Sequence, residues 1–218
     1  MSSGGWHGRP IVTSIRAGHN TPLGSPRARD GGLKDVKMQR ADHSAFVSAL
    51  ADDFLRVSRH QLRGRLQRIE TCLGWLSDEQ IWSRRHEVEN AVGNLVLHLC
   101  GNISQWIVGG VGGVPVSRDR DAEFARRDPL PVDALVRRLR AVVREADAVL
   151  AGLTPDNLVE SRRIQGYEVT VLHAIYHVVE HLAEHTGQII WATKGLTGED
   201  LGFYAYLEDQ DQHTSRQP

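Results

Sequence analysis

Four histidines follow one another at four-residue intervals in the C-terminal third of the chain: His173, His177, His181 and His185. On an α-helix, residues four apart lie on one side, about 6 Å from each other. Two imidazoles at that spacing can both reach one metal ion at about 2.0–2.1 Å. The residues between the last two are LAE, so this is not the HExxH motif of zinc proteases. The spacing indicates either a metal site of another kind or a polar stripe of surface histidines.

The apolar residues of the same segment indicate which histidines face the interior. At about 100° per residue they cluster in one sector of the helix: Val171, Ile175, Val178, Leu182 and Ile189. His185 lies nearest the centre of this sector, His181 next, His177 farther round and His173 farthest. We therefore predict that His181 and His185 form the inward pair and that His173 faces away. Whether His177 takes part stays open.

A third ligand is expected from a facing helix, because two imidazoles do not make a tight site. The segment AVGNLVLHLCGNISQWIV is apolar except for a line of polar residues at four-residue spacing, Asn94, His98 and Asn102. Buried polar groups must find partners, so His98 is either a hydrogen-bonded core residue or the third ligand. The inward pair favours the ligand. Asn94, Asn102 and Gln188 would then orient the imidazoles, and Gly101 would permit close approach of the backbone.

A site of three histidines leaves one position of a tetrahedral ion open to water or substrate. Such an ion could lower the pKa of a bound water, stabilise a thiolate or polarise a carbonyl, and the sequence does not choose among these. No carboxylate can be assigned as a base. Glu180 and Glu184 flank the histidines but point away from the apolar sector, so we expect them to be solvated. In a third interpretation there is no metal, and the histidines and asparagines form a buried hydrogen-bond network.

Four segments with helical periodicity would position these residues. They cover about residues 43–76, 90–107, 131–153 and 169–194, with Asn90 as the N-cap of the second and Gly195 closing the fourth. No segment shows convincing strand alternation. The expected fold is all-α, a single antiparallel four-helix bundle over residues 41–200.

The two ends of the chain have a different composition from the bundle. Residues 1–40 are rich in Gly, Pro, Ser and Arg and are expected to be a disordered arm, with the natural start at Met38. Residues 201–218 are expected to be a polar tail.

Composition excludes several classes of protein. Among 218 residues, 26 Lys and Arg face 27 Asp and Glu, so no global basic field points to nucleic acid or to an anionic membrane. No apolar run approaches the roughly 20 residues that span a bilayer, and the N-terminus lacks the apolar segment of a secretory signal. Cys72 and Cys100 lie far apart and indicate no disulfide framework. We expect a cytoplasmic protein that acts on a small molecule.

The segments NAVGNLVLHLCGNISQWI and VVEHLAEHTGQIIWATK, with RDRDAEF between them, together resemble the DinB-like superfamily. Within it they are similar to a branch of bacterial domains of unknown function, and the resemblance covers about residues 43–196. It implies a four-helix bundle in which three histidines bind a divalent metal, zinc or nickel, at one end. By motif position those ligands are His98, His181 and His185, the trio that the packing pattern favours.

The resemblance also implies a function. Characterised members include S-transferases and isomerases that use a low-molecular-weight thiol, and many form homodimers. We therefore expect a metal-dependent, thiol-dependent S-transferase in which the metal holds the thiolate. The alternatives are a metal-dependent hydrolase with the same ligands, and a non-catalytic metal-binding or dimerisation protein of the stress response whose site a fourth ligand such as His177 would close.

Overall fold

The structure, a computed structural model, describes residues 31–205, with side chains from residue 42 onward. Four long helical elements dominate it: α1 (Gly31–Trp75), α3 (Val92–Ile103) with its π-helical continuation η1 (Ser104–Val111), α5 (Val132–Ala151) and α6 (Val171–Thr197). Short elements connect them: α2 (Asp78–Trp82), α4 (Arg120–Ala125), the 3-10 helix η2 (Pro155–Val159), β1 (Ser161–Ile164) and β2 (Tyr167–Thr170). The expected all-α four-helix bundle is confirmed.

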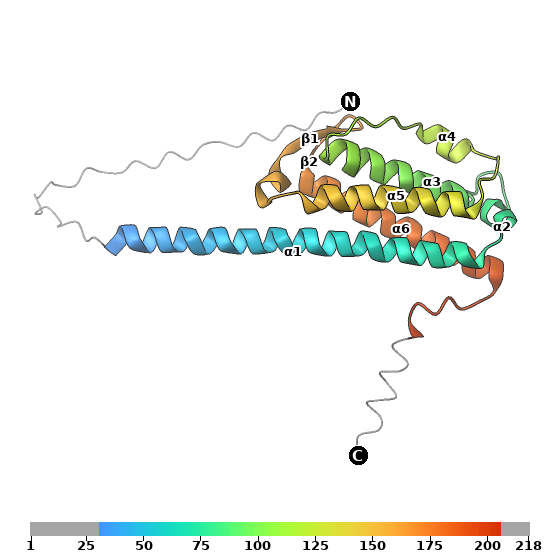
Figure 1. The fold of residues 1–218 in the computed structure, drawn as a ribbon, viewed down its shortest axis with the longest axis horizontal. Coiled ribbons are helices and arrows are strands. Elements are labelled where there is room, and N and C mark those ends of the chain that lie inside the picture. Colours follow the sequence, from blue (N-terminus) through green and yellow to red (C-terminus); the bar gives the residue numbers. More distant parts are fainter. Residues whose placement is uncertain (1–30, 206–218) are drawn as a thin grey trace, which may run out of the picture. The chain divides into compact units, whose positions relative to one another are not determined.

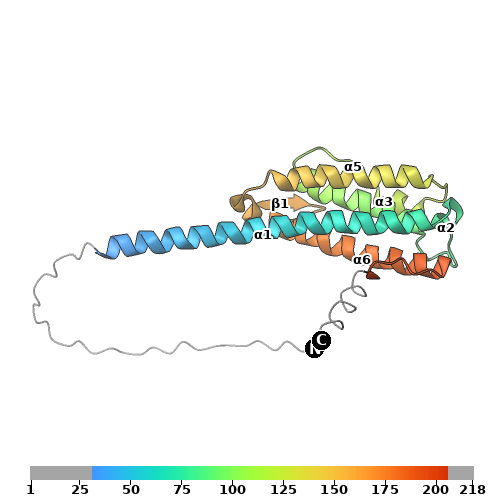
Figure 2. The same cartoon turned by 60° about the horizontal axis from the view of Figure 1, so that its bottom comes forward.

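The direction of each helix follows from its connections (Figures 1 and 2). α3 and α5 run in the same direction, opposite to α1 and α6. The N-terminal ends of α3 and α5 lie close together. Trp82 Nε1, in the segment before α3, donates a hydrogen bond to the carbonyl of Leu130, in the segment before α5, at 3.0 Å. Their ends meet where Gly112 lies against Val149. The connection between them therefore returns along the bundle, and this return places α4 against α3.

The core contains the apolar stripes that the sequence predicted for α5 and α6. In α5, Leu135, Leu139 and Ala146 are fully buried. In α6, the five residues of the apolar sector are all buried. Since each fully buried Leu or Ile side chain contributes about 1.5–3 kcal/mol through the hydrophobic effect, these stripes fix which face of each helix turns inward.

The first helix differs from its prediction in two ways. It begins at Gly31 rather than near residue 43, because residues 33–41 contain good helix formers even though they lack an apolar period. Met38, the predicted natural start, lies inside this helix. Residues 1–30 and 206–218 of the expected arm and tail lie outside the described residues. Phe46 and Leu50, which belong to the predicted stripe, are 66% and 62% exposed, and the buried part of α1 begins with Ala51.

A β-hairpin joins α5 to α6, so the expectation of no strands was wrong. Strands β1 and β2 pair antiparallel through a two-residue turn, Gln165 and Gly166, both with positive φ. This conformation is typical of type I′ hairpins. Ile164 and Val169 are the buried residues of the two strands, and Ile164 packs against Gly110 of η1. Four-residue strands are too short for alternation to be recognised.

Two helix ends also differ from prediction. The N-cap of α3 is Ala91 rather than Asn90, without a side-chain hydrogen bond, a difference of the size expected for helix boundaries. Gly195 lies inside α6, which ends where Gly198 adopts a left-handed conformation with φ 73°. At its start, Thr170 Oγ1 accepts a hydrogen bond from the backbone N–H of His173 at 3.2 Å. These ends give α6 the length to carry all four histidines.

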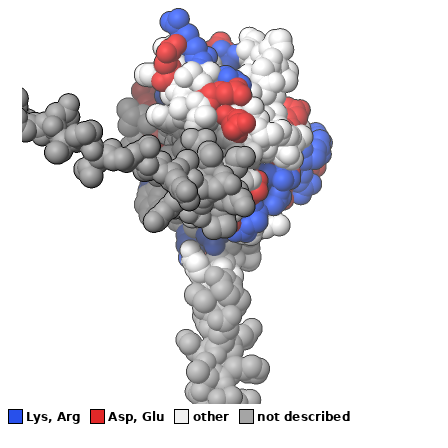
Figure 3. Space-filling model, turned by 90° about the vertical axis from the view of Figure 1, so that its left-hand side faces the viewer, with Lys and Arg blue, Asp and Glu red and all other residues white. Residues whose placement is uncertain are grey.

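The surface bears on the expected partners. No helix of the described part combines the length and the apolar character that crossing a membrane requires. On the face seen in Figure 3, acidic and basic side chains are interspersed. Cys72 and Cys100 are both buried free thiols.

Candidate metal centre

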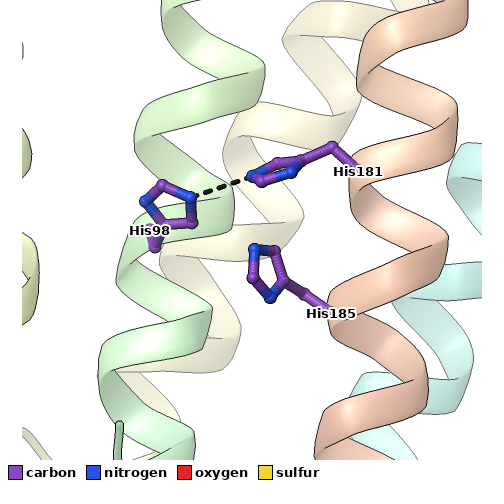
Figure 4. A group of neighbouring side chains, drawn as sticks. All are labelled: His98, His181 and His185. Carbon is purple, nitrogen blue, oxygen red and sulfur yellow. Dashed lines mark hydrogen bonds between the residues drawn. The ribbon is translucent and has the colours of Figure 1, made fainter. Parts of the chain in front are cut away.

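The structure brings the three predicted ligands together. His98 lies on α3, and His181 and His185 lie on the facing side of α6, with their rings turned toward one another (Figure 4). One ring nitrogen from each lies within 4.8 Å of the other two. Nε2 of His98 and Nε2 of His181 are 2.9 Å apart. Three neutral imidazoles at this separation can share one divalent ion.

A carboxylate on α4 sets the orientation of His98. Oε2 of Glu123 lies 3.0 Å from His98 Nδ1. Arg118 donates to the same carboxylate from Nε at 2.8 Å and from Nη2 at 2.9 Å. Arg118 Nη2, which can only donate, also lies 3.1 Å from His98 Nδ1. An ionised carboxylate can only accept, however, so the contact with Glu123 is a hydrogen bond only when Nδ1 is the donor. Nδ1 of His98 therefore carries the proton, and its Nε2 lone pair is left for a metal.

The Arg118–Glu123 pair is buried, with side chains 5% and 11% exposed. Burial alone would raise the pKa of Glu123, but hydrogen bonds from Arg118 and His98 outweigh it and hold the pKa below its usual range. Arg118 also donates to Oε1 of Gln105 at 2.9 Å. The carboxylate is thus ionised and strongly held, so it acts as a fixed acceptor rather than as a mobile base.

Gly101 makes room for this pair. A Cβ at position 101 would lie 1.8 Å from Glu123 Oε1 and 2.7 Å from Arg118 Nε. The close approach predicted at Gly101 is therefore present, although side chains rather than backbone make it. At the other side of the pair, Asp119 caps α4 by accepting from the N–H of Ala122 at 2.9 Å.

Gln188 orients the third imidazole. Its Oε1 lies 2.7 Å from Nδ1 of His185, and an amide oxygen can only accept there. His185 Nδ1 therefore carries the proton, as in His98, and its Nε2 is free for a metal. Gln188 thus contacts one of the three predicted ligands, as an orienting residue would.

The environment keeps the imidazoles of α6 neutral. Burial, together with the neighbouring His185, lowers the pKa of His181 to about 3. Burial also lowers the pKa of His185, although the hydrogen bond to Gln188 acts in the opposite direction. Both rings are therefore unprotonated at neutral pH. A metal needs this state, so the donor set fits a divalent ion such as zinc or nickel.

The two asparagines contact other groups than the ligands. Asn94 Nδ2 donates to the backbone carbonyl of Glu123 at 2.7 Å, and its Oδ1 accepts from Arg84. Asn94 therefore acts on His98 only through α4, which it holds against α3. Asn102 Nδ2 lies 3.4 Å from Nε2 of His177 and contacts none of the three ligands. The sequence predicted that both asparagines orient ligand imidazoles, but their side chains form hydrogen bonds with other groups.

His177 stays outside the group of three. Its ring packs against Trp106 in a tilted arrangement, with centroids 4.2 Å apart, and lies nearly parallel to the His181 ring at 5.6 Å. Within residues 42–205 no fourth His, Cys, Asp or Glu joins the cluster. His173 is exposed, as predicted, and so are Glu180 and Glu184.

Glu123 and Arg118 are the site residues that the sequence did not identify. Both lie in the RDRDAEF segment, where the resemblance to the DinB-like family was the only signal. Cys100, two residues after His98, is buried on the other side of α3, and burial raises the pKa of its thiol to about 12. It is an inert core residue.

Solved structures share this fold. A conserved protein from Enterococcus faecalis matches with a TM-score of 0.55 and 14% identity, over 66% of this chain and 97% of that chain. A DinB-like protein from Bacillus cereus matches with a TM-score of 0.50 and 16% identity, over 60% of this chain and 85% of that chain. The chain therefore shares the helical-bundle fold of these two proteins.

The sequence itself defines the family. Residues 49–205 match the profile of DUF1572, described as a protein of unknown function, and the chain belongs to this family. No curated protein matches the chain.

Proposed function

We propose that this chain is a divalent-metal-dependent enzyme that activates a low-molecular-weight thiol for transfer to an electrophile. The observation that carries the proposal is the arrangement of His98, His181 and His185: one ring nitrogen of each lies within 4.8 Å of the other two, with no fourth protein ligand within the described residues. An ion held there, zinc or nickel, supplies a Lewis acid that keeps a coordinated thiol ionised.

The protein's residues have separate tasks in this proposal. The three histidines would hold the ion, which would supply the Lewis acid that ionises the thiol. Glu123 and Gln188 fix the rings of His98 and His185 through their Nδ1 atoms. Arg118 neutralises Glu123, so the site carries no net charge from its orienting groups. In the transfer, the thiol proton goes to solvent, a bond forms between sulfur and the electrophilic carbon, and the leaving group departs with its electron pair.

The environment favours a thiol over water as the nucleophile. Water has a pKa of about 15.7, whereas a thiol begins near about 8.5, so a thiol needs far less help to ionise. Hydrolysis at the same ion would be faster with a mobile carboxylate that accepts a proton from the attacking water. Glu123 is committed to Arg118 and His98, while Glu180 and Glu184 are exposed. The hydrolase is therefore the weaker alternative.

A purely structural metal site is also less well supported. Structural zinc sites use four protein ligands, and the residue that would close this one, His177, packs against Trp106 instead. The expected homodimer and cytoplasmic location rest on the family resemblance and on composition. Static light scattering at several protein concentrations tests the dimer directly.

Thiol transfer is tested with metal-loaded protein purified without a metal-affinity tag. The zinc and nickel forms are mixed with glutathione and 1-chloro-2,4-dinitrobenzene, and thioether formation is followed by absorbance. We expect metal-dependent catalysis that His181→Ala abolishes and that His173→Ala, a change at an exposed histidine of the same helix, retains. Metal-dependent hydrolysis of 4-nitrophenyl acetate without any thiol-dependent product would favour the hydrolase instead.

A further inference from the structure

Two adjoining hollows lie between the start of α3 and the second half of α6, beside the metal centre. They share four lining residues, Glu89, Asn90, Trp191 and Ala192, so they form one continuous groove, named here the α3–α6 groove. Its wider part has a volume of about 490 Å³ and its narrower part about 130 Å³. Trp191 is 66% exposed and lines both parts.

One end of the groove adjoins the proposed metal ligands, although none of the three histidines lines it. Gln188 lines the wider part and also accepts the hydrogen bond of His185. On α3, Leu95 lines the same part and precedes His98 by three residues, so the two lie on one face of the helix. Along α6, Ala192 follows His185 by seven residues, two helical turns farther along the face that carries the ligands. A molecule in the groove can therefore place one end beside His185, the ligand that Gln188 contacts.

The other end of the groove is cationic, lined by Arg84 and Arg85. Arg85 is already paired: it donates to Glu89 at 2.8 Å, and its guanidinium lies 5.4 Å from the Trp191 ring centre. Arg84 is not. Its hydrogen bonds within the described residues all come from Nη2 and go to the side-chain oxygen of Asn94 and, at 3.1 Å, the backbone carbonyl of Arg126.

Arg84 thus has unused donors and no counter-charge. Within residues 42–205 no carboxylate pairs with it, and burial, with Arg127 adding repulsion, lowers its pKa. A guanidinium offers five N–H donors in a planar fork that matches a carboxylate. Its neighbour Asn94 precedes His98 by one helical turn, about 5.4 Å along α3. An anionic group bound at Arg84 therefore lies within reach of a small molecule that also contacts the histidine cluster.

We infer that the α3–α6 groove binds a small thiol or electrophile with an apolar body and a carboxylate, whose carboxylate pairs with Arg84 and whose reacting end lies at His98, His181 and His185. The inference rests on the proposed function for the reacting end only. The apolar body lies along Leu95, Ala192 and the Trp191 ring. The carboxylate supplies the counter-charge that Arg84 lacks.

The test compares matched probes on zinc-loaded protein. Mercaptoalkanoates of increasing chain length are titrated against mercaptoalkanols of the same length, which differ only in the terminal group, and binding is followed by calorimetry. We expect the best carboxylate to bind about tenfold more tightly than its alcohol, as a charge-assisted pair with a guanidinium provides. In Arg84→Gln this ratio falls to about one while the affinity for the alcohol is unchanged. Arg137→Gln, at an exposed arginine of α5, keeps the wild-type ratio.

A second variant covers the case in which Arg84→Gln does not fold. Trp191→Glu changes an exposed residue and places a competing carboxylate in the groove, so the preference for carboxylate probes is expected to disappear. Trp191→Ala is expected to weaken both probe types several-fold, because it removes the apolar wall. Trp75→Ala, at an exposed tryptophan of α1, changes neither.

Probes without a thiol separate this inference from the proposed function. Alkanoates that bind wild type better than Arg84→Gln support the groove even if no thiol binds the zinc form, a result that would overturn the thiol proposal alone. Equal affinity for carboxylate and alcohol in wild type, with tight binding of both thiols, overturns the groove inference and leaves the thiol proposal intact. Absence of binding by any probe overturns both.

Discussion

Replacing Glu123 with glutamine removes the charge that orients His98 while leaving a side chain of almost the same size. In the structure Glu123 accepts from His98 Nδ1 at 3.0 Å and from Arg118 twice, at 2.8 and 2.9 Å. The amide oxygen of the glutamine can still accept from one of these donors. Its NH₂ group cannot accept, and it would face the remaining N–H donors of Arg118 or His98. We expect zinc affinity to fall by about 10–100-fold, the usual effect of losing a group that orients a metal ligand.

The same change destabilises the fold, because it leaves Arg118 without a counter-charge. The Arg118 side chain is only 5% exposed, so solvent does not replace the lost carboxylate. Removing one partner of a buried ion pair costs about 3–5 kcal/mol, and the remaining bond from Arg118 to Gln105 offsets part of this. We expect the free energy of unfolding of the metal-free protein to fall by about 2–4 kcal/mol.

Two measurements separate the effects. Zinc affinity is measured by competition with a chromophoric chelator, and stability by urea denaturation of the metal-free protein. Glu184→Gln is the matched control, since Glu184 is exposed and adjoins His185 in sequence. Unchanged zinc affinity in Glu123→Gln, together with a normal fold, would refute the view that the carboxylate positions His98.

Three further predictions follow from the packing around the site and in the bundle. Gly101→Ala is expected to displace Glu123 and to lower zinc affinity about as much as Glu123→Gln, because its Cβ would lie 1.8 Å from the carboxylate; a chelator competition assay checks this. Gln188→Ala is expected to weaken zinc binding about tenfold with little change in urea stability, since Gln188 is exposed. The hydrogen bond from Arg59 lowers the pKa of Asp147 below 3.8, so this group stabilises the fold above that pH and less as the pH falls through its folded pKa. Asp147→Asn is therefore expected to cost about 1 kcal/mol at pH 7, and urea denaturation at pH 7, 5 and 3 should show the difference shrinking at the lowest pH.

The sequence predicted those features that repeat along one helix. The apolar sector of α6 decided which of four equally spaced histidines face inward, and the structure places His181 and His185 there and His173 at the surface. His98 could be identified because a lone ionisable residue in an apolar helix needs a partner. The hydrophobic period is a local property, so a single segment contains the information.

The features that the sequence did not predict depend on contacts between segments. Glu123 reaches His98 only because the connection after η1 returns along the bundle and places α4 on α3, which no local pattern encodes. Asn102 shares a helical line with His98, yet its partner is His177, a choice set by the register of α6 against α3. Phe46 and Leu50 show why an amphipathic period is not proof of burial: the period is present, but both side chains are exposed.

The central claim is that His98, His181 and His185 hold one divalent metal ion. The most direct test is the metal content of protein purified without an affinity tag, measured by plasma mass spectrometry after incubation with zinc or nickel and removal of the excess. We predict about one ion per chain in wild type and in His173→Ala, and almost none in His98→Ala and His181→Ala. A metal-free wild type, or a content that both ligand variants retain, would contradict the account and leave the three histidines as a buried hydrogen-bond network.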